Sequence, residues 1–142
     1  MAALTAAADR DMKEGKLITL LVDDGDTIYK GALVMLNSAG YAVEGADTSG
    51  GVFMGVADET ADNAAGADGA ISIRVRTTGV YAFAYSGTLN QASIGTKCYI
   101  VDDNTVAAAA TTTNDVLCGH VVGLKAAGVA WVRIDRAAGG AA

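Results

Sequence analysis

Short runs of valine, isoleucine, leucine, tyrosine and threonine recur along the chain, separated by glycine, asparagine, aspartate and serine. Runs of this kind, bounded by turn-forming residues, are typical of β-strands. Proline is absent, so the other turn formers, among them 18 glycines, supply the reversals of the chain. The pattern predicts ten strands, at residues 17–23, 32–36, 41–43, 52–57, 70–76, 80–85, 97–101, 105–107, 116–124 and 129–135.

Two tight connections in this pattern predict hairpin turns, at residues 37–40 and 102–104. Residues 2–14 contain good helix formers but no apolar stripe, and such a segment does not hold a helix alone. We therefore expect residues 1–15 to be a flexible N-terminal arm. The stretch 58–69 contains glycine and asparagine and is expected to be a loop.

The chain repeats its own pattern. Matching positions lie 64 residues apart, and they include two glycine pairs that are expected to do the same backbone job in each half. Gly31 and Gly95 would each begin a strand after a turn, and Gly55 and Gly119 would each mark a bulge or a close approach. The last strands of the halves match at an offset of 59, because the loop 58–69 is longer than its counterpart.

Two copies of an open strand unit can cover each other's apolar faces. The expected fold class is therefore all-β, a small barrel or sandwich formed from two tandem copies of a strand motif. We expect a single β domain over residues 16–136, with pseudo-repeats 16–76 and 80–135. Residues 137–142 are expected to form a disordered tail.

Arginines and the single tryptophan lie on one side of two predicted strands. In the strand at 70–76 the branched apolar residues alternate with polar ones, which include Arg74 and Arg76. In the last strand, Trp131 and Arg133 face away from the apolar set, and the repeat makes Arg74 and Arg133 equivalent. An ordinary solvated face explains these residues. The alternative is a contact surface for an acidic neighbour, anchored by Trp131.

Two predicted strands depart from simple alternation. One is apolar on both faces, and the other has bulky aromatic residues on one face and alanines on the other. The run 17–22 is apolar at nearly every position, and such a strand is buried on both faces or lies at a subunit interface. In the other strand Tyr81, Phe83 and Tyr85 share one face, opposite small alanines. We expect core packing for both strands, with a partner chain as the alternative.

Composition excludes several classes of function. The formal net charge is −6 and no run of lysine and arginine occurs, so a nucleic acid is not an expected partner. The apolar run 17–22 is too short to span a bilayer, and the N-terminus lacks the pattern of a secretion signal. We expect a soluble protein made in a cytoplasm. Charged residues make up only 18% of the chain, which favours a surface partly covered by other subunits.

The sequence contains few candidates for catalytic or metal-binding residues. Cys98 and Cys118 are expected to be small buried apolar side chains kept reduced, with a disulfide as the alternative. His120 lies in an apolar run and is expected to be a core or interface residue. Nucleophile, phosphate-loop and dinucleotide motifs are absent from the sequence, as is any Cys-x-x-Cys pair. We therefore expect no catalytic residues, no metal and no cofactor.

The acidic clusters are also expected to be structural rather than functional. Residues 23–26 contain three aspartates but lack the distal glutamate of an EF-hand loop, so a turn is expected there rather than a calcium site. The same holds for residues 102–104. Asp58, Glu59 and Asp62 are expected to lie in an exposed acidic loop rather than to act as an acid/base set.

Six segments within residues 16–136 show a repeated pattern of short predicted strands and glycines. They are Lys-Leu-Ile-Thr-Leu-Leu-Val at 16–22, Gly-Ala-Leu-Val at 31–34, Val-Phe-Met-Gly-Val-Ala at 52–57, Gly-Thr-Lys-Cys-Tyr-Ile-Val-Asp-Asp at 95–103, Val-Leu-Cys-Gly-His-Val-Val-Gly at 116–123 and Val-Ala-Trp-Val-Arg-Ile at 129–134. In these segments the chain resembles the head decoration proteins, also called capsid cement proteins, of tailed bacteriophages.

The resemblance implies a β-rich homotrimer made in the host bacterial cytoplasm. It would bind the outer surface of the icosahedral head where major capsid subunits meet, and stabilise the expanded shell. The alanine-rich arm does not match the family, and we hypothesise that it becomes ordered on the capsid. The expected capsid or subunit contacts are Leu4, Arg10, Met12, Lys13, Lys16, Arg74, Arg76, Trp131 and Arg133.

Other functions remain as alternatives. A tail tube subunit or head fibre base would also be a virion β-barrel, but a tube subunit would assemble into rings rather than discrete trimers. A carbohydrate-binding β module would normally show aromatic platforms beside polar clusters, and Trp131 is the only tryptophan. An enzyme would need a nucleophile with a base, a carboxylate pair or a metal cluster.

Overall fold

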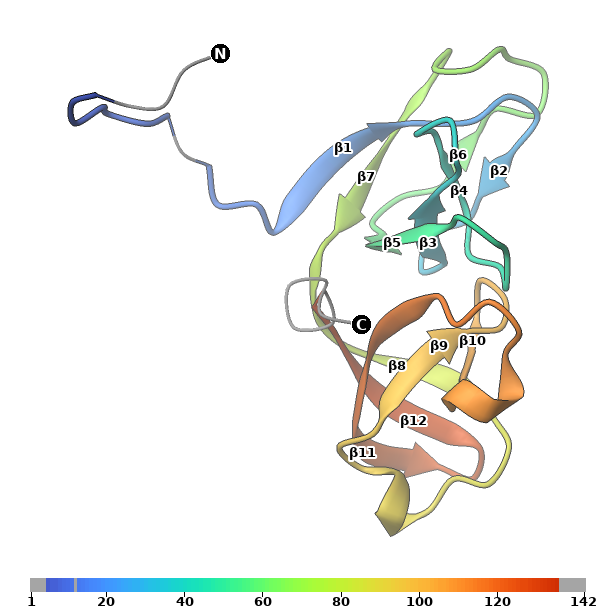
Figure 1. Ribbon diagram of the computed structural model, residues 1–142. Helices are drawn as coiled ribbons and strands as arrows, with labels where there is room; N and C mark the ends of the chain where they lie inside the picture. The colour runs from blue at the N-terminus through green and yellow to red at the C-terminus, as the bar shows by residue number, and fades with distance from the viewer. Residues whose placement is uncertain (1–4, 12, 136–142) are drawn as a thin grey trace.

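The chain is almost entirely β-structure, which confirms the predicted fold class (Figure 1). A computed structural model describes residues 5–11 and 13–135. All ten predicted strands are present, with bounds shifted by at most a few residues. The strands are β1 (Leu17–Leu21), β2 (Thr27–Ile28), β3 (Leu33–Leu36), β4 (Ala42–Glu44), β5 (Val52–Ala57), β6 (Ala61–Asp62), β7 (Ser72–Arg76), β8 (Thr78–Ser86), β9 (Lys97–Ile100), β10 (Thr105–Ala107), β11 (Leu117–Ala126) and β12 (Val129–Asp135), and the 3₁₀ helices are η1 (Gln91–Ser93) and η2 (Ala109–Thr111).

Each half of the chain pairs its own strands. The first half forms a five-stranded sheet in the order β1-β7-β5-β3-β4, and the second forms a closed barrel in the order β10-β8-β12-β11-β9. Begun at β8, the barrel reads β8-β12-β11-β9-β10, which is the first order with every strand replaced by its repeat. The two copies lie one above the other in Figure 1. The sequence predicted one compact barrel or sandwich shared by both copies, whereas each copy pairs its strands in a sheet of its own.

The two copies share hydrogen bonds as well as strand order. Four backbone hydrogen bonds of the first half recur in the second half between residues 64 positions further on, with donor–acceptor distances of 2.7 to 3.1 Å. The pairs, donor first, are Gly31–Ala57 and Gly95–Val121, Ala57–Ala32 and Val121–Thr96, Ala32–Tyr29 and Thr96–Ser93, and Asn37–Tyr41 and Val101–Thr105. The last of these pairs closes the hairpin turn predicted in each half.

The copies differ in how far they close. In the second copy, β8 and β10 pair in parallel over three residues, which completes the barrel. In the first copy the equivalent contact is a single parallel bridge between Val22 and Ala42, with one amide hydrogen bond from Asp23 to the Ala42 carbonyl at 3.0 Å. The first copy is therefore a barrel whose seam between β1 and β4 is almost open.

Gly55 and Gly119 make the same close approach in the two copies, as predicted. Each lies at a shift of strand register. A Cβ atom on Gly55 would lie 2.1 Å from the Arg76 carbonyl oxygen, and one on Gly119 would lie 2.1 Å from the Arg133 carbonyl oxygen. No side chain fits at that distance, so the strand pairing depends on glycine here.

The two copies are packed against each other. Leu33, Phe53 and Val56 of the first copy belong to the apolar cluster that fills the barrel of the second. The Leu33 amide also donates a hydrogen bond to the Asp103 carbonyl at 2.9 Å. Most of the other buried apolar residues of the first copy form a second cluster, which includes Ile73. Leu33 therefore contacts the second copy through a backbone hydrogen bond and through its buried side chain.

The segment predicted as a loop, residues 58–69, contains a short strand that the sequence did not indicate. There β6 pairs with β2, which forms a two-stranded ribbon. Asn63 is buried next to it, and its side-chain amide donates to the carbonyls of Val22, Asp23 and Ala67 at 3.3, 2.9 and 2.9 Å. A buried amide that finds these partners fixes the loop without an apolar pattern.

Two sequence predictions need correction. Core packing of β1 is wrong for one of its faces, because Leu17 and Leu21 are 40% and 54% exposed. The structural equivalent of Arg133 is Arg76 rather than Arg74. Arg76 lies opposite Val56, and Arg133 lies opposite His120, which is 64 positions beyond Val56. Core packing does hold for the β8 aromatics, since Phe83 is buried and Tyr81 and Tyr85 pack against the same cluster.

Replacing Gly119 by alanine should lower the free energy of unfolding by about 2–4 kcal/mol, because β11 and β12 must move apart. Gly55→Ala should cost a similar amount, since the contact is the same. Urea unfolding at constant pH measures both values. Gly95→Ala is the control, with a φ of +88° but no atom within 4 Å of the added Cβ, and it should lose only about 1 kcal/mol. Equal losses at Gly95 and Gly119 would contradict the close-approach argument.

Candidate interaction surface

Exposed apolar side chains lie on the outward side of β1, β8 and β12. Besides Leu17 and Leu21, Val80 is 47% exposed and Trp131 is 37% exposed. The chain runs from β7 into β8 through Thr77, and the alternation of outward positions is unbroken across this join. We call the outward side chains of β1, β7, β8 and β12 the outer face.

Trp131 stands uncovered because its strand neighbours are small. Ala82 of β8 and Gly123 of β11 lie opposite it. The Lys125 ammonium is 5.9 Å from the centroid of the ring, a cation–π contact of about 0.5–1 kcal/mol at an exposed site. An exposed tryptophan between small neighbours is typical of an anchor in a protein–protein contact.

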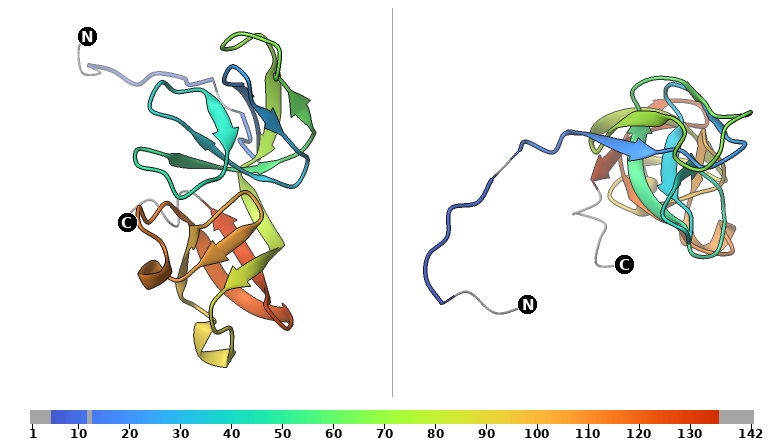
Figure 2. Two further views of the ribbon diagram at one scale, coloured as in Figure 1. Left: turned by 90° about the vertical axis from the view of Figure 1, so that its right-hand side faces the viewer. Right: turned by 90° about the horizontal axis from the view of Figure 1, so that it is seen from above.

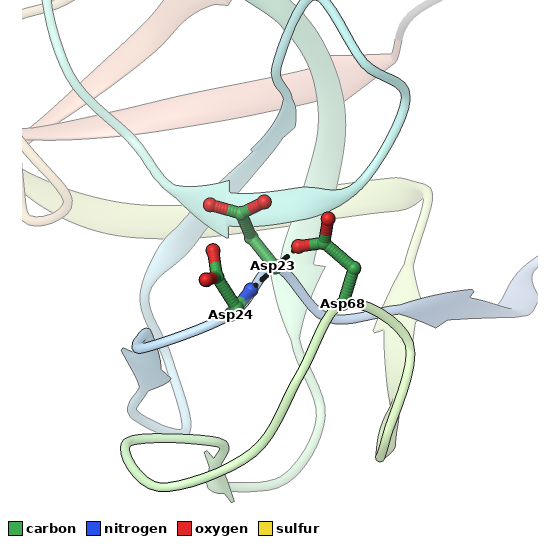
Figure 3. A group of neighbouring side chains, drawn as sticks. All are labelled: Asp23, Asp24 and Asp68. Atoms are coloured by element: carbon green, nitrogen blue, oxygen red, sulfur yellow. Dashed lines mark hydrogen bonds between the residues drawn. The ribbon is translucent and has the colours of Figure 1, made fainter.

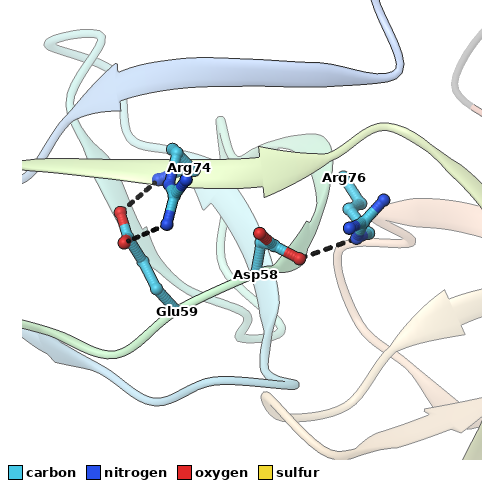
Figure 4. A network of polar contacts seen from close by, with 4 residues as sticks. All are labelled: Asp58, Glu59, Arg74 and Arg76. Atoms are coloured by element: carbon cyan, nitrogen blue, oxygen red, sulfur yellow. Dashed lines mark hydrogen bonds and ion pairs between the residues drawn. The ribbon is translucent and has the colours of Figure 1, made fainter.

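The arginines of β7 have acidic partners within the same chain (Figure 4). Glu59 accepts from both the backbone amide and the guanidinium of Arg74, at 3.1 and 3.0 Å. These bonds hold the pKa of the Glu59 carboxyl below its usual range and raise the pKa of Arg74. Arg76 Nε lies 2.7 Å from an oxygen of Asp58. A neighbour's carboxylate would therefore share these arginines with Asp58 and Glu59.

The N-terminal arm begins at the join between the two copies. The Thr77 amide donates to the Lys16 carbonyl at 3.0 Å, and the Thr77 hydroxyl donates to the Gly15 carbonyl at 2.6 Å. Lys16 also pairs with Glu14 at 3.3 Å. Before Gly15 the described residues run away from the body of the protein, as Figures 1 and 2 show. The arm is thus anchored at its root beside the outer face.

Three carboxylates from two loops form a separate acidic cluster (Figure 3). One ligand atom from each of Asp23, Asp24 and Asp68 lies within 4.8 Å of the others. One of the Asp68 oxygens already accepts a hydrogen bond from the Asp24 amide at 2.9 Å. The sequence placed Asp23 and Asp24 in a turn, and the fold adds Asp68 to them.

A hollow of about 340 Å³ lies beside this cluster, lined by Asp23, Asp26 and Glu44 among others. Partial burial and the charges of Asp23 and Asp24 raise the pKa of Asp26. Partial burial and the charges of Asp103 and Asp26 raise the pKa of Glu44. The negative charges around this hollow therefore repel one another.

The structure brings some of the predicted contact residues together and leaves others apart. Arg74 and Arg76 share one side of β7, and Trp131 and Arg133 share one side of β12, so all four belong to the outer face. Lys16 lies at the root of the arm. Arg10 and Lys13 are exposed further out along the arm, and Leu4 and Met12 lie outside the described residues.

Sequence reasoning missed the exposed Leu17, Leu21 and Val80 as surface candidates. The lack of alternation in residues 17–22 was a signal for the two leucines, since it is compatible with a subunit interface as well as with core packing. The pairing of Asp58 and Glu59 with the arginines was also missed, because it depends on the loop after β5 folding back along β7.

Comparisons with protein-family models, with curated proteins and with solved structures gave no match. Within residues 5–11 and 13–135, no helix has the length and apolar character needed to cross a membrane.

Replacing Asp26 by asparagine should stabilise the protein at pH 7. The pKa of Asp26 is raised in the folded state, so its ionisation opposes folding above that pKa, and the effect fades towards about pH 3, where the carboxyl is largely protonated in both states. The gain should be below about 1 kcal/mol because the group is partly solvated. Thermal unfolding between pH 3 and pH 7 measures it, and the gain should vanish at the acid end.

Asp62→Asn is the matched control with the opposite sign. Hydrogen bonds from the Ala64 amide and the Thr27 hydroxyl lower the pKa of Asp62. Its ionised form therefore favours folding above the unfolded pKa, and this contribution disappears as the pH falls. The variant should melt earlier than the parent at pH 7, and the difference should shrink as the pH falls towards 3. Stabilisation of both variants at pH 7 would indicate a general effect of lower negative charge and would contradict a specific effect of burial and neighbouring charges at Asp26.

Proposed function

We propose that this protein is a decoration, or cement, protein of a tailed-bacteriophage head. In this proposal it binds as a homotrimer to the outer surface of the icosahedral capsid, where major capsid subunits meet, and stabilises the expanded shell. It acts by binding and carries out no catalysis. Its partners are the major capsid protein and further copies of the same chain.

The resemblance in six segments supports the proposal, since these segments make up most of the two strand copies. The opening segment, 16–22, is β1 and the residues beside it. The segments at 95–103 and 116–123 contribute β9 and β11, and the last contributes β12 with Trp131. The residues that carry the resemblance thus lie in six of the ten strands of the two copies, and on the outer face they include β1 and β12 but not β7 or β8.

The observation that carries the proposal is the apolar outward side of β1 at an open strand edge. Leu17 and Leu21 face outward, and along the edge opposite β7 the described residues supply only the bridge at Val22. Soluble proteins usually protect such an edge with a charge, a proline or a bulge, and residues 17–22 contain no charge or proline. Exposed apolar side chains at an unprotected edge favour a surface that another chain covers.

Coverage of a regular lattice also suits a protein without a deep binding site. Many modest contacts, multiplied by the valency of a trimer, give high occupancy without one tight pocket. The net charge of −6 opposes capture by nucleic acid in the host cell.

Co-sedimentation with undecorated heads, expanded and unexpanded side by side, tests the proposal directly. Saturable binding to expanded heads, with three copies per binding site and a trimer mass in solution, is the expected result. Ring or tube assembly would instead indicate a tail tube subunit, and selective glycan binding would indicate a carbohydrate module. Absence of binding to both head forms would overturn the proposal.

Charged substitutions on β1 should weaken binding to heads. Leu17→Asp and Leu21→Asp place a carboxylate on the apolar part of the outer face, and each should reduce the apparent affinity about tenfold or more. Ile94→Asp is the control, because Ile94 is 36% exposed but lies in the loop before β9. Circular dichroism establishes that all three variants fold. Full occupancy of heads by both β1 variants would remove the outer face from the proposal.

Deletion of residues 2–15 should also weaken binding to heads, because the arm is expected to become ordered on the capsid. The β-structure should survive, since the arm contributes no strand within the described residues. Occupancy at increasing protein concentration, compared with that of the full chain, measures the effect. Unchanged occupancy would show that the arm does not contribute.

A further inference from the structure

The only two cysteines of the chain meet inside the barrel of the second copy. Cys98 on β9 and Cys118 on β11 are both buried and both are free thiols. Their sulfur atoms are 3.9 Å apart, and the Cys118 thiol also donates to the Cys98 carbonyl at 3.4 Å. Twenty positions of sequence separate them, so the fold rather than the chain creates this contact.

The two thiols meet at a bulge in β11. Tyr99 lies opposite Leu117 and Cys98 lies opposite Gly119, which leaves Cys118 as the extra residue between the two pairs. Cys118 and Gly119 therefore both lie against Cys98, as two residues of a bulged strand lie against one residue of its partner. Both cysteines are buried in the barrel, and the close approach of Gly119 to β12 is part of the same bulge.

The first copy shows that this position does not require thiols. Val34 and Met54 stand 64 positions before Cys98 and Cys118, at a bulge of the same register around Gly55. Val34 is fully buried and Met54 is half-buried. The frame therefore accepts two ordinary apolar side chains here, and packing alone does not explain a cysteine at both positions of one copy.

We propose that Cys98 and Cys118 are an oxidation site that forms a disulfide between β9 and β11. The sulfurs must approach from 3.9 Å to about 2 Å, the length of a disulfide bond. This inference does not rest on the proposed function.

The oxidant is a small-molecule disulfide such as oxidised glutathione. One cysteine thiolate attacks it and releases one reduced thiol, which leaves a mixed disulfide on the protein. The second cysteine then attacks the protein sulfur and releases the second reduced thiol. The two cysteines lose two electrons and two protons, and the reagent gains both as two thiols.

Burial makes this reaction slow in the folded state. The hydrogen bond with Cys98 and the apolar surroundings raise the pKa of Cys118, so little thiolate is present at neutral pH. The reaction therefore proceeds through local opening of the barrel or during refolding. Once formed, the bond joins strands that are already adjacent, and it closes a loop of about 20 residues in the unfolded chain.

Refolding of the full chain in a glutathione redox buffer tests the proposal. Intact mass under non-reducing conditions should show a monomer lighter by two hydrogen atoms with no glutathione attached. Alkylation in denaturant should then modify neither cysteine, and peptide mapping should recover residues 98 and 118 in one linked fragment. The oxidised protein should melt roughly 6–12 °C above the reduced protein.

Matched variants remove the two thiols with little change in side-chain volume. Cys98→Val takes its side chain from Val34, the equivalent residue of the first copy, and Cys118→Ala avoids overpacking, because Cys118 is buried in the closed barrel whereas Met54 is half-buried. The double variant should melt near the reduced parent protein and should not respond to the redox buffer. Each single variant should form only a mixed disulfide or an intermolecular dimer, with no stabilisation.

Two results would overturn the proposal. One is a refolded parent protein whose two cysteines both remain open to alkylation in denaturant after equilibration with the oxidant. The other is a cross-linked parent protein that melts no higher than its reduced form, because a bond between strands in the native arrangement should stabilise the fold.

Discussion

The strand pairing of both copies depends on one close contact, in which a glycine of one strand lies against the carbonyl of the next. At Gly55 and at Gly119 an added Cβ would lie 2.1 Å from that carbonyl oxygen. The approach bends the strand at a bulge, and a bend at this position lets a five-stranded sheet curl toward closure. Repetition of the contact explains why the two halves reach the same strand order although few of their side chains match.

Because the two copies share one strand order, a small number of residues accounts for the structural differences between them. The second copy closes through three residue pairs between β8 and β10, while the first stops at the Val22–Ala42 bridge. Beyond Val22 the chain of the first copy turns away toward the β2–β6 ribbon, which Asn63 holds in place. Within the described residues the edge of β1 opposite β7 is therefore left almost unpaired, and the proposal of a capsid-binding protein begins from that edge.

Comparison of the two copies distinguishes positions where the strand pairing requires one residue type from positions where several types fit. Gly55 and Gly119 cannot change without a steric conflict, so both copies keep them. At the neighbouring bulge positions one copy has Val34 and Met54 and the other has two cysteines. Differences of this second kind are where a function of the individual copy is to be sought, and the thiol pair is the clearest of them.

The sequence by itself determined ten of the twelve strands of the described residues, the two hairpin turns and the repeat, because alternation of apolar residues and the spacing of turn formers are local properties. It also predicted the role of Gly55 and Gly119, since matched glycines inside strands indicate a backbone requirement. Tertiary structure alone decided the rest. Which strands pair, how far each copy closes, and whether Leu17 faces a core or solvent depend on contacts between distant segments. The meetings of Asp68 with Asp23 and of the two thiols depend on them too, and no local pattern records such contacts.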